Sequence, residues 1–355
     1  MIIKIVIADN DKEYIEYFQR AVALNYASKL EISFFSNEEN LRKYLIEKKC
    51  DILLISEYME QAEEEFNCRK IILTDIKGIE HKKDYKVIYK YQKIEDIYHS
   101  IVAEYAEIKE KEGIVFRNKG NAKIISFLSA SGGAGKTTIC FAVAKLLCSM
   151  KKDVLYVPLE QFSNINYMYP GDETKTLSNL FYATKERKNT LSIQIKNMIR
   201  PSMNGMLFLR PMDSPAELEQ MTAEDWDFFL NALVDIEGID YILLDHVSGI
   251  FQNFKEILER VNSICFIAES SLTGIVKATS MISYFRKFDE FQDTAFCRKI
   301  RVVVNKARLG VTEQDFYHLQ DWIVSYLPDY GVAEMEGIIE AIAQLSECKK
   351  ILELS

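Results

Sequence analysis

The sequence predicts an α/β protein with two doubly wound domains, each a parallel sheet covered by helices. Short apolar runs of strand length alternate with segments of helical periodicity along the chain. A length of 355 residues is typical of two domains. A charged segment with two glycines, residues 109–122, interrupts the apolar pattern and is the best linker candidate. We therefore expect domains at residues 1–107 and 123–355, joined by a linker at residues 108–122.

The first domain is expected to contain five strands and three helices. Helical spacing begins after the first strand, at Tyr14, and further helices are expected over Asn40–Lys48 and Ile94–Ile108. Sites in such sheets lie at the carboxyl ends of the strands. The predicted strands are Ile2–Ile7, Ile32–Phe35, Asp51–Ile55, Ile71–Leu73 and Lys86–Tyr89.

The second domain opens with the strongest motif in the chain. Ile124–Leu128 reads as a strand, Ala130–Gly135 as a turn of small residues, and Lys136 begins a helical pattern. Glycines allow successive backbone N–H groups to turn inward, and the helix N-terminus adds positive charge, so this order predicts a phosphate cradle. Lys136 would reach the β- and γ-phosphates, and the Thr137 hydroxyl would bind Mg²⁺. The candidate phosphate-binding residues are Gly132, Gly133, Ala134, Gly135, Lys136, Thr137 and Thr138.

One position departs from the usual phosphate-loop pattern, because Ala130 stands where the first glycine is expected. The alternative interpretation is a glycine-rich turn that binds nothing. The strand, loop and helix context favours a nucleotide site.

Further elements are expected along the rest of the second domain. Asp245 follows a buried strand, which would bring its carboxylate to the same sheet edge as the phosphate loop. Strands are predicted at Asp153–Val157, Gly205–Arg210, Asp240–Leu244, Ser263–Ala268 and Ile300–Val304, and helices at Ala216–Val234, Gly274–Phe288 and Met335–Leu354.

Composition narrows the possible functions. The net charge of −9 argues against nucleic-acid binding, which requires a basic face. Seven scattered cysteines without a C-x-x-C pair fit reduced thiols in a cytoplasmic protein. The N-terminus is too short and too acidic for a signal peptide, and no apolar run approaches the length of a membrane span. Peripheral membrane association is possible but not indicated by the C-terminal helical pattern, which carries both acidic and basic residues.

Residues 1–107 resemble the receiver domain of two-component response regulators. The segments IVIADND and DILLISEYM correspond to the first and third strands of that family. Asn10 replaces one carboxylate of the acidic cluster that begins at Asp9, and Ser56 stands where the phosphoacceptor aspartate would be. Thr74 ends the fourth predicted strand and Lys90 lies at the end of the fifth, as in the family. The chemistry needs an aspartyl nucleophile, so the resemblance implies a degenerate receiver used for docking or dimerisation. A flavodoxin-like spacer without signalling ancestry is the alternative.

Residues 123–355 resemble the MinD/ParA family of deviant Walker ATPases, and with the receiver-like front end the chain resembles its TadZ/CpaE branch. The motifs SGGAGKTT, DYILLDHVSG, RVVVNKAR and MLFLRPMDSPAEL carry this resemblance. It implies ATP and Mg²⁺ as ligands, with Asp245 holding Mg²⁺ through water. It also implies that Asn305 and Lys306 bind the adenine, and that Pro328 and Asp329 lie in the loop that closes over the base.

The resemblance fails at two catalytic positions. Ser131 stands where the family has a signature lysine, and Pro158 and Glu160 stand where it has a D-x-D segment. Glu160 is then the candidate water-orienting residue. Hydrolysis needs an oriented water and charge neutralisation. We therefore expect ATP binding with slow or absent turnover.

The resemblance further implies a homodimer with pilus, secretion or polar protein partners, concentrated at a cell pole. A normally cycling MinD/ParA-type ATPase is one alternative. A response-regulator-like switch is the other.

Overall fold

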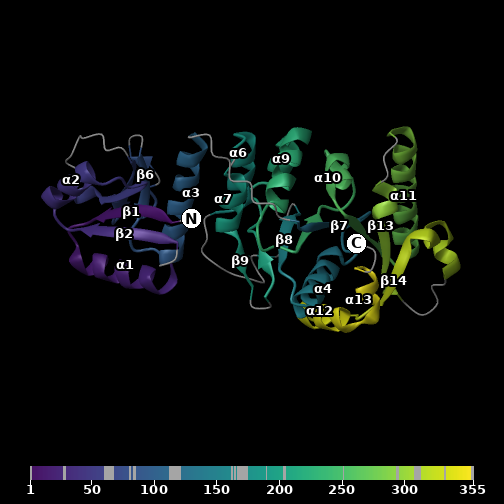
Figure 1. Cartoon of the computed structure of the whole chain (residues 1–355). Helices are drawn as coiled ribbons and strands as arrows, with labels where there is room; N and C mark the ends of the chain where they lie inside the picture. Colours follow the sequence, from purple (N-terminus) through teal and green to yellow (C-terminus); the bar gives the residue numbers. More distant parts are fainter. Residues whose placement is uncertain are drawn as a thin grey trace. The chain divides into compact units, whose positions relative to one another are not determined.

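The structure is a computed structural model of the chain (Figure 1). It divides into two compact units, residues 1–116 and 117–355, which are described separately. The predicted linker overlaps the end of the last helix of the first unit, and most of it lies outside the described residues. The structure describes every residue except 1, 27–28, 60–67, 80, 83–84, 112–120, 161–162, 164, 166–174, 189, 203–204, 251, 293–295, 308–312, 332 and 353–355.

The first unit is a sheet with strand order β2-β1-β3-β4-β6-β5, parallel except for β5. The apolar strands are buried on both sides, and each side has its own core cluster. Asp11 caps the first helix by accepting from the backbone N of Tyr14 at 3.0 Å. The strands are β1 (Ile3–Ala8), β2 (Leu30–Phe35), β3 (Ile52–Ser56), β4 (Arg69–Thr74), β5 (His81–Lys82) and β6 (Tyr85–Tyr89). The helices are α1 (Lys12–Asn25), α2 (Glu38–Glu47), α3 (Ile94–Lys111) and the 3₁₀ turn η1 (Glu57–Met59).

This arrangement confirms the predicted doubly wound sheet and corrects one detail. Strands were expected to alternate with helices, but β4 and β6 are joined through the short antiparallel strand β5, and no helix occurs among the described residues between them. Only ten residues separate the two strands, which is too short for a helical crossover.

The second unit is a sheet with strand order β14-β13-β12-β7-β11-β8-β10-β9, in which only β9 runs antiparallel to its neighbour. Its strands are β7 (Lys123–Ser129), β8 (Val154–Leu159), β9 (Arg200–Pro201), β10 (Leu207–Phe208), β11 (Tyr241–His246), β12 (Ser263–Glu269), β13 (Ile300–Ala307) and β14 (Ile323–Pro328). Its helices are α4 (Lys136–Ser149), α6 (Leu177–Lys185), α7 (Leu191–Met198), α8 (Ala216–Gln220), α9 (Ala223–Val234), α10 (Phe254–Arg260), α11 (Leu272–Gln292), α12 (Met335–Gln344) and α13 (Ser346–Lys350), with 3₁₀ turns η2 (Phe296–Lys299) and η3 (Glu313–Trp322).

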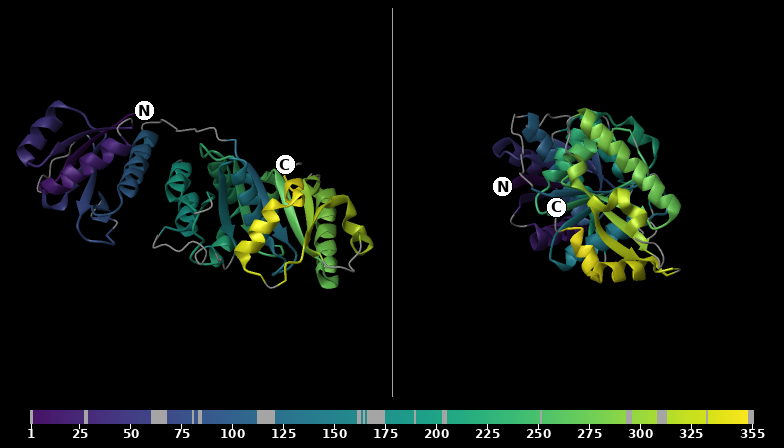
Figure 2. Two further views of the ribbon diagram at one scale, coloured as in Figure 1. Left: turned by 90° about the horizontal axis from the view of Figure 1, so that it is seen from below. Right: turned by 90° about the vertical axis from the view of Figure 1, so that its right-hand side faces the viewer.

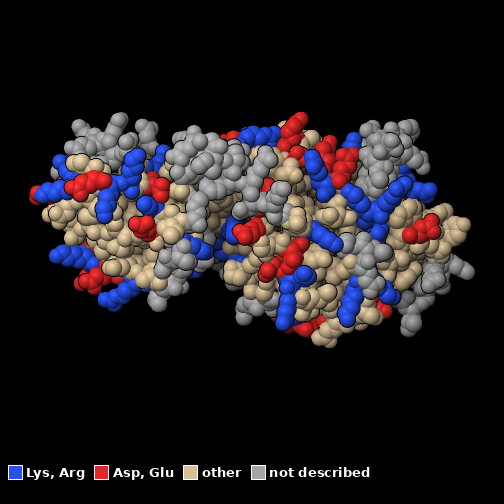
Figure 3. All heavy atoms as spheres, viewed as in Figure 1, with Lys and Arg blue, Asp and Glu red and all other residues tan. Residues whose placement is uncertain are grey.

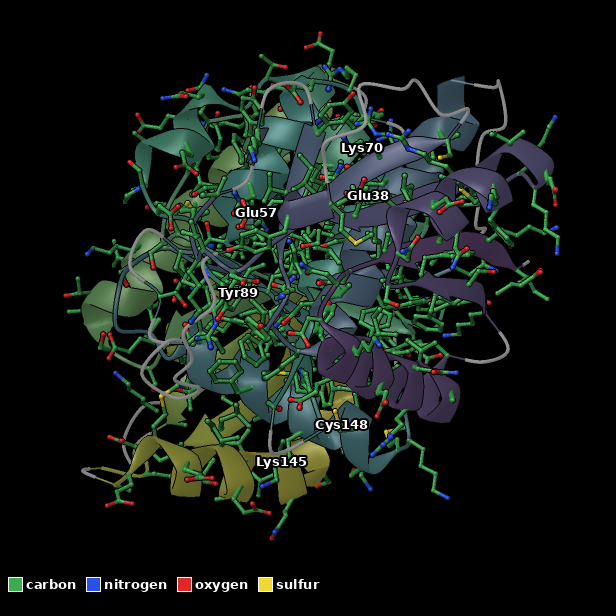
Figure 4. All side chains as sticks on the ribbon, turned by 90° about the vertical axis from the view of Figure 1, so that its left-hand side faces the viewer. Glu38, Glu57, Lys70, Tyr89, Lys145 and Cys148 are labelled. Atoms are coloured by element: carbon green, nitrogen blue, oxygen red, sulfur yellow. The ribbon has the colours of Figure 1, made fainter. Side chains whose placement is uncertain are left out.

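Helices cover both faces of this second sheet (Figures 1 and 2). One core cluster joins the sheet to α6, α7, α9, α10 and α11, and the other joins it to α4, α12 and α13. Lys145 of α4 forms an ion pair with Glu340 of α12, and Figure 4 shows Lys145 beside that helix. The C-terminal pattern therefore packs on the sheet, as its mixed charge suggested. No described helix is long and apolar enough to cross a membrane.

Two element predictions in this unit need correction. The strand expected at Gly205–Arg210 is reduced to β10, two residues that pair with β8 and β9. The helix expected at Met335–Leu354 is broken at Leu345, which has extended backbone angles between α12 and α13. An apolar residue at this position continues the helical spacing, so periodicity alone gives no sign of the break.

Candidate nucleotide-binding site

The predicted phosphate loop connects the central strand β7 to α4. Gly133 and Gly135 have positive φ angles of 78° and 91°. These angles favour glycine, because the Cβ of any other residue would clash with the backbone. A Cβ at Gly135 would also collide with the side-chain amide of Asn305. Gly132 and Gly133 are exposed, whereas Ala134 is buried. The loop is thus built as the sequence predicted, with its backbone accessible at the glycines.

Lys136, the first residue of α4, lies between two carboxylates. Its Nζ is 2.5 Å from Oδ1 of Asp245 and 2.7 Å from Oε1 of Glu160. The Lys136 and Asp245 side chains are 4% and 0% exposed. Burial alone would lower the pKa of Lys136, but the two carboxylates hold it above its usual value. The ammonium is therefore charged and pairs with both carboxylates, although its single positive charge can balance only one of them.

Asp245 is at the end of β11, which lies between β7 and β8 in the sheet. Its Oδ2 accepts hydrogen bonds from the Thr137 hydroxyl at 2.7 Å and from the Tyr156 hydroxyl at 2.9 Å. With Lys136 on Oδ1, both oxygens of this buried carboxylate are occupied. The next residue, His246, points to the opposite face, where its Nε2 is 2.9 Å from the Ser126 hydroxyl. Burial lowers the pKa of His246 to about 3, so this imidazole is neutral.

Glu160 follows β8 and is half-buried at the same edge. Its Oε1 also accepts from the Thr137 hydroxyl, at 3.1 Å. Burial and the neighbouring Asp245 raise the pKa of Glu160 above its ordinary value, although Lys136 and Thr137 act in the opposite direction.

These groups fit Mg²⁺ and a nucleotide. Mg²⁺ prefers hard oxygen ligands and is commonly bound by one or two carboxylates together with substrate phosphates. The Thr137 hydroxyl lies 3.1 Å from Oε1 of Glu160 and 2.7 Å from Oδ2 of Asp245, so three oxygen groups gather at one point. Lys136 and the glycine backbone lie next to them. Thr138 is half-buried in the first turn of α4, where its backbone N–H belongs to the positive helix end.

The predicted base-binding residues lie against the phosphate loop. The Asn305 amide donates to the carbonyl oxygen of Ala134 at 2.8 Å, and Nζ of Lys306 donates to the carbonyl oxygen of Gly133 at 2.8 Å. Lys306 also contacts Oε1 of Glu269 at 2.9 Å and has a positive φ of 56°. The end of β13 therefore holds the loop directly.

Pro328 and Asp329 lie next to this end of β13. Pro328 pairs with Ala307, and the backbone N of Asp329 donates to the carbonyl of Ala307 at 3.3 Å. Both residues thus contact Ala307, the residue after Lys306.

Ser131 is a half-buried residue of the phosphate loop and carries no charge. Arg187 and Lys188 are two basic residues of the second unit that could substitute for a lysine reaching a partner's nucleotide. However, Arg187 contacts Asp225 at 2.9 Å and the carbonyl of Glu224 at 3.2 Å, both at the start of α9. Lys188 pairs with Glu186 at 2.8 Å. Arg187 is thus paired with the start of α9, and Lys188 with the residue that follows α6.

The degenerate receiver site also forms at one sheet edge. Lys90 is buried, and its Nζ lies 2.9 Å from Asp75, 3.5 Å from Asp9 and 3.7 Å from Asp11. Burial alone would lower the pKa of Lys90, but these carboxylates raise it above its usual value. Asn10, the other predicted member of the acidic cluster, is exposed. One lysine is thus shared by three carboxylates, and its single positive charge can balance only one of them.

Ser56 and Thr74 end the neighbouring strands β3 and β4 and are both buried. The Thr74 hydroxyl donates to Oε1 of Glu57 at 2.8 Å, while the Ser56 hydroxyl accepts from the backbone N of Tyr58 at 3.4 Å. Glu57, labelled in Figure 4, thus supplies the carboxylate that accepts the hydrogen bond from Thr74. This contact was not predicted, because Glu57 and Thr74 are 17 positions apart and meet only when β3 and β4 pair.

Tyr156 and Glu269 were also missed. Tyr156 looked like one more apolar residue of a buried strand, although the alternation of side chains along β8 places it on the same face as Glu160. Glu269 ends β12 beside β13, so the rule that parallel strands share a carboxyl edge could have found it.

Comparisons with known proteins relate different parts of the chain to different proteins. Residues 1–106 match the family model described as "TadZ-like, receiver domain". The septum site-determining protein MinD of Thermotoga maritima is 23% identical over 219 residues, which are 59% of this chain and 76% of that protein. The crystal structure of a ParA family ATPase from Chlorobium tepidum TLS has a TM-score of 0.50 at 17% identity, over 66% of this chain and 93% of that one. This chain therefore combines a TadZ-like receiver segment with a unit that has the MinD/ParA fold.

Proposed function

We propose that the protein binds ATP with Mg²⁺ and serves as a nucleotide-dependent scaffold that positions other proteins, in the manner of TadZ and CpaE. The assembly it directs would be a Tad-type pilus or secretion apparatus. The match of residues 1–106 to the TadZ-like receiver model supports the class of partner, and the MinD/ParA fold supports a role in localisation.

The observation that carries the nucleotide proposal is the buried cluster of Lys136, Thr137, Glu160 and Asp245. A lysine paired with two carboxylates can exchange them for phosphate oxygens, while the carboxylates and the Thr137 hydroxyl remain to hold a cation. Bound Mg²⁺ would neutralise charge on the β- and γ-phosphates. Asn305 and Lys306 would bind the adenine while they hold the loop, and Pro328 and Asp329 would cover it.

Weak or absent hydrolysis follows from the residues that are missing. Pro158 offers no side-chain polar group to orient a water, and Ser131 carries no charge toward a partner's nucleotide. Each lost part of a phosphoryl-transfer site can cost orders of magnitude in rate. ATP would then act as a ligand that stabilises one conformation or a homodimer.

A cycling MinD/ParA-type ATPase is the second candidate, and the position of Glu160 favours it. Its carboxylate lies 2.7 Å from Lys136 and 3.1 Å from the Thr137 hydroxyl, next to where a γ-phosphate would lie. In that case Glu160 would orient the attacking water. Steady phosphate release that Glu160→Gln abolishes would establish this candidate over the scaffold.

The receiver-like unit would serve docking or dimerisation without phosphorylation. Ser56 cannot form an acyl phosphate, and Lys90 and Thr74 are already paired with carboxylates. Acetyl phosphate should leave the mass of this unit unchanged. A stable phosphoryl adduct on residues 1–107 would instead support a response-regulator-like switch.

The proposed setting is the cytoplasm, with concentration at a cell pole and binding to protein partners. On the face shown in Figure 3, Lys and Arg are interspersed with Asp and Glu, and the proposal includes no nucleic-acid partner. The test is capture of pilus or secretion proteins and mass measurement with and without ATP. If neither ATP nor Lys136→Ala changes mass or partner capture, nucleotide gating is wrong.

A further inference from the structure

One face of β8 supplies two polar groups to the cluster around Lys136. Side chains alternate along a strand, so Tyr156, Pro158 and Glu160 follow one another on one face. The core clusters show the same alternation, because Tyr156 packs with α4 on one side of the sheet while its two neighbours, Leu155 and Val157, pack on the other. Pro158 lies between the phenol and the carboxylate and adds no polar side-chain atom.

The Tyr156 hydroxyl has a well-defined partner. The side chain is completely buried, its ring lies 4.7 Å from that of Phe141, and its hydroxyl is 2.9 Å from Oδ2 of Asp245. A carboxylate can only accept, so the phenol is the donor. Burial and Asp245 raise the pKa of Tyr156 well above its ordinary value, which keeps the proton on the hydroxyl.

We propose that Tyr156 is a positioning residue for Asp245 in the metal-nucleotide site. The inference rests on the proposed function, since it concerns how this chain would hold Mg²⁺ with ATP. In the structure, Asp245 has three donors, on Lys136, Thr137 and Tyr156. Binding of a nucleotide draws Lys136 to phosphate and Thr137 to the cation, and Tyr156 is the donor of the three that stays.

Loss of the Tyr156 hydroxyl should affect metal binding specifically. A hydrogen-bond donor behind a metal-binding carboxylate fixes its orientation, and loss of such a partner typically weakens metal binding about 10- to 100-fold. The phosphate contacts of the loop backbone do not pass through Tyr156. Removing the hydroxyl should therefore weaken the metal-dependent part of ATP binding and leave metal-free binding unchanged.

The test is Tyr156→Phe in the full chain, with ATP binding titrated in the chelator EDTA and Mg²⁺ then titrated at fixed ATP. We expect the Mg²⁺ midpoint to rise about 10-fold or more while ATP affinity in EDTA stays within about twofold of wild type. An unchanged Mg²⁺ midpoint would overturn the proposal. Equal losses with and without Mg²⁺ would also overturn it, because they would show a purely structural role.

A double-mutant cycle with Asp245→Asn tests whether Tyr156 affects Mg²⁺ binding through Asp245. If Tyr156 acts through Asp245, Tyr156→Phe should add no further loss of Mg²⁺ dependence in the Asp245→Asn background, and additive losses would contradict the proposal. Tyr14→Phe is the matched control, because Tyr14 is also buried but its hydroxyl has no hydrogen-bond partner among the described residues. If wild type binds no ATP under any condition, the proposed function itself fails, and the role of Tyr156 falls with it.

Discussion

Removal of the Lys136 ammonium should destabilise the second unit before any nucleotide is added. Lys136→Ala leaves the Asp245 carboxylate, completely buried, without its cation, and leaves Glu160 beside it. Breaking a buried ion pair by removing one partner costs about 3–5 kcal/mol. Since a unit of this size shifts by about 2–4 °C per kcal/mol, the melting temperature should fall by roughly 10 °C.

Glu160→Gln should not lower the melting temperature in this way and should instead raise it or leave it unchanged. The folded-state pKa of Glu160 lies above its ordinary value of 4.5, so at neutral pH the folded state disfavours the charged form. A neutral amide avoids this cost, and the variant should melt at or above the temperature of wild type at pH 8. Because its pKa is raised in the folded state, Glu160 stabilises the fold below pH 4.5, and this contribution is lost as the pH rises through the folded-state pKa. The advantage of the variant should therefore shrink as the pH falls.

Tryptophan fluorescence is a suitable assay, because Trp226 and Trp322 are the two tryptophans of the chain and both belong to the second unit. Melts should be recorded without nucleotide and with a chelator, from pH 5 to pH 8. A loss for Glu160→Gln as large as that for Lys136→Ala, and independent of pH, would refute the reasoning. It would show that the Lys136–Glu160 pair stabilises the fold.

Three further outcomes follow from the same contacts. Glu57→Ala should destabilise the first unit by about 1–3 kcal/mol, because it leaves the buried Thr74 hydroxyl without its acceptor; denaturant titration of wild type and variant measures this. Glu104 of α3 is buried and pairs with Arg69 at 2.8 Å and Lys86 at 3.1 Å, so Glu104→Gln should also destabilise that unit at pH 7. Burial alone would raise the pKa of Glu104, but the two cations lower it below 4.5; the stability difference between wild type and variant, measured by denaturant titration, should therefore vanish as the pH falls through that folded-state pKa. Gly135→Ala should abolish ATP binding and lower stability, because its φ is 91° and a Cβ meets the Asn305 amide, whereas Gly337→Ala, at an exposed position of α12 with open space around it, should retain both; equal binding by the two variants would contradict this account of the loop.

The parts of the fold with strong periodicity could be predicted from the sequence. The strand, loop and helix around Lys136 were recognisable because apolar strand residues, glycines and a helical pattern follow one another. Asp245 was placed correctly at the sheet edge, since parallel strands present their carboxyl ends together. These inferences depend on local spacing and on one topological rule.

The remaining features depend on tertiary contacts that local spacing does not encode. The break at Leu345 and the short strand β5 depend on packing and on a short connection. The bond from Tyr156 to Asp245 joins residues 89 positions apart, and a tyrosine in an apolar strand is usually core. Glu57 acquires its role only when β3 and β4 pair and bring Thr74 beside it.

The most direct test of the central claim measures ATP binding and phosphate release on one preparation with Mg²⁺, beside Lys136→Ala and with mass recorded in parallel. The proposed scaffold predicts Mg²⁺-dependent ATP binding that Lys136→Ala abolishes, with little or no phosphate release. Sustained turnover that Glu160→Gln removes would contradict the scaffold and establish a cycling ATPase. Absence of any binding would contradict both.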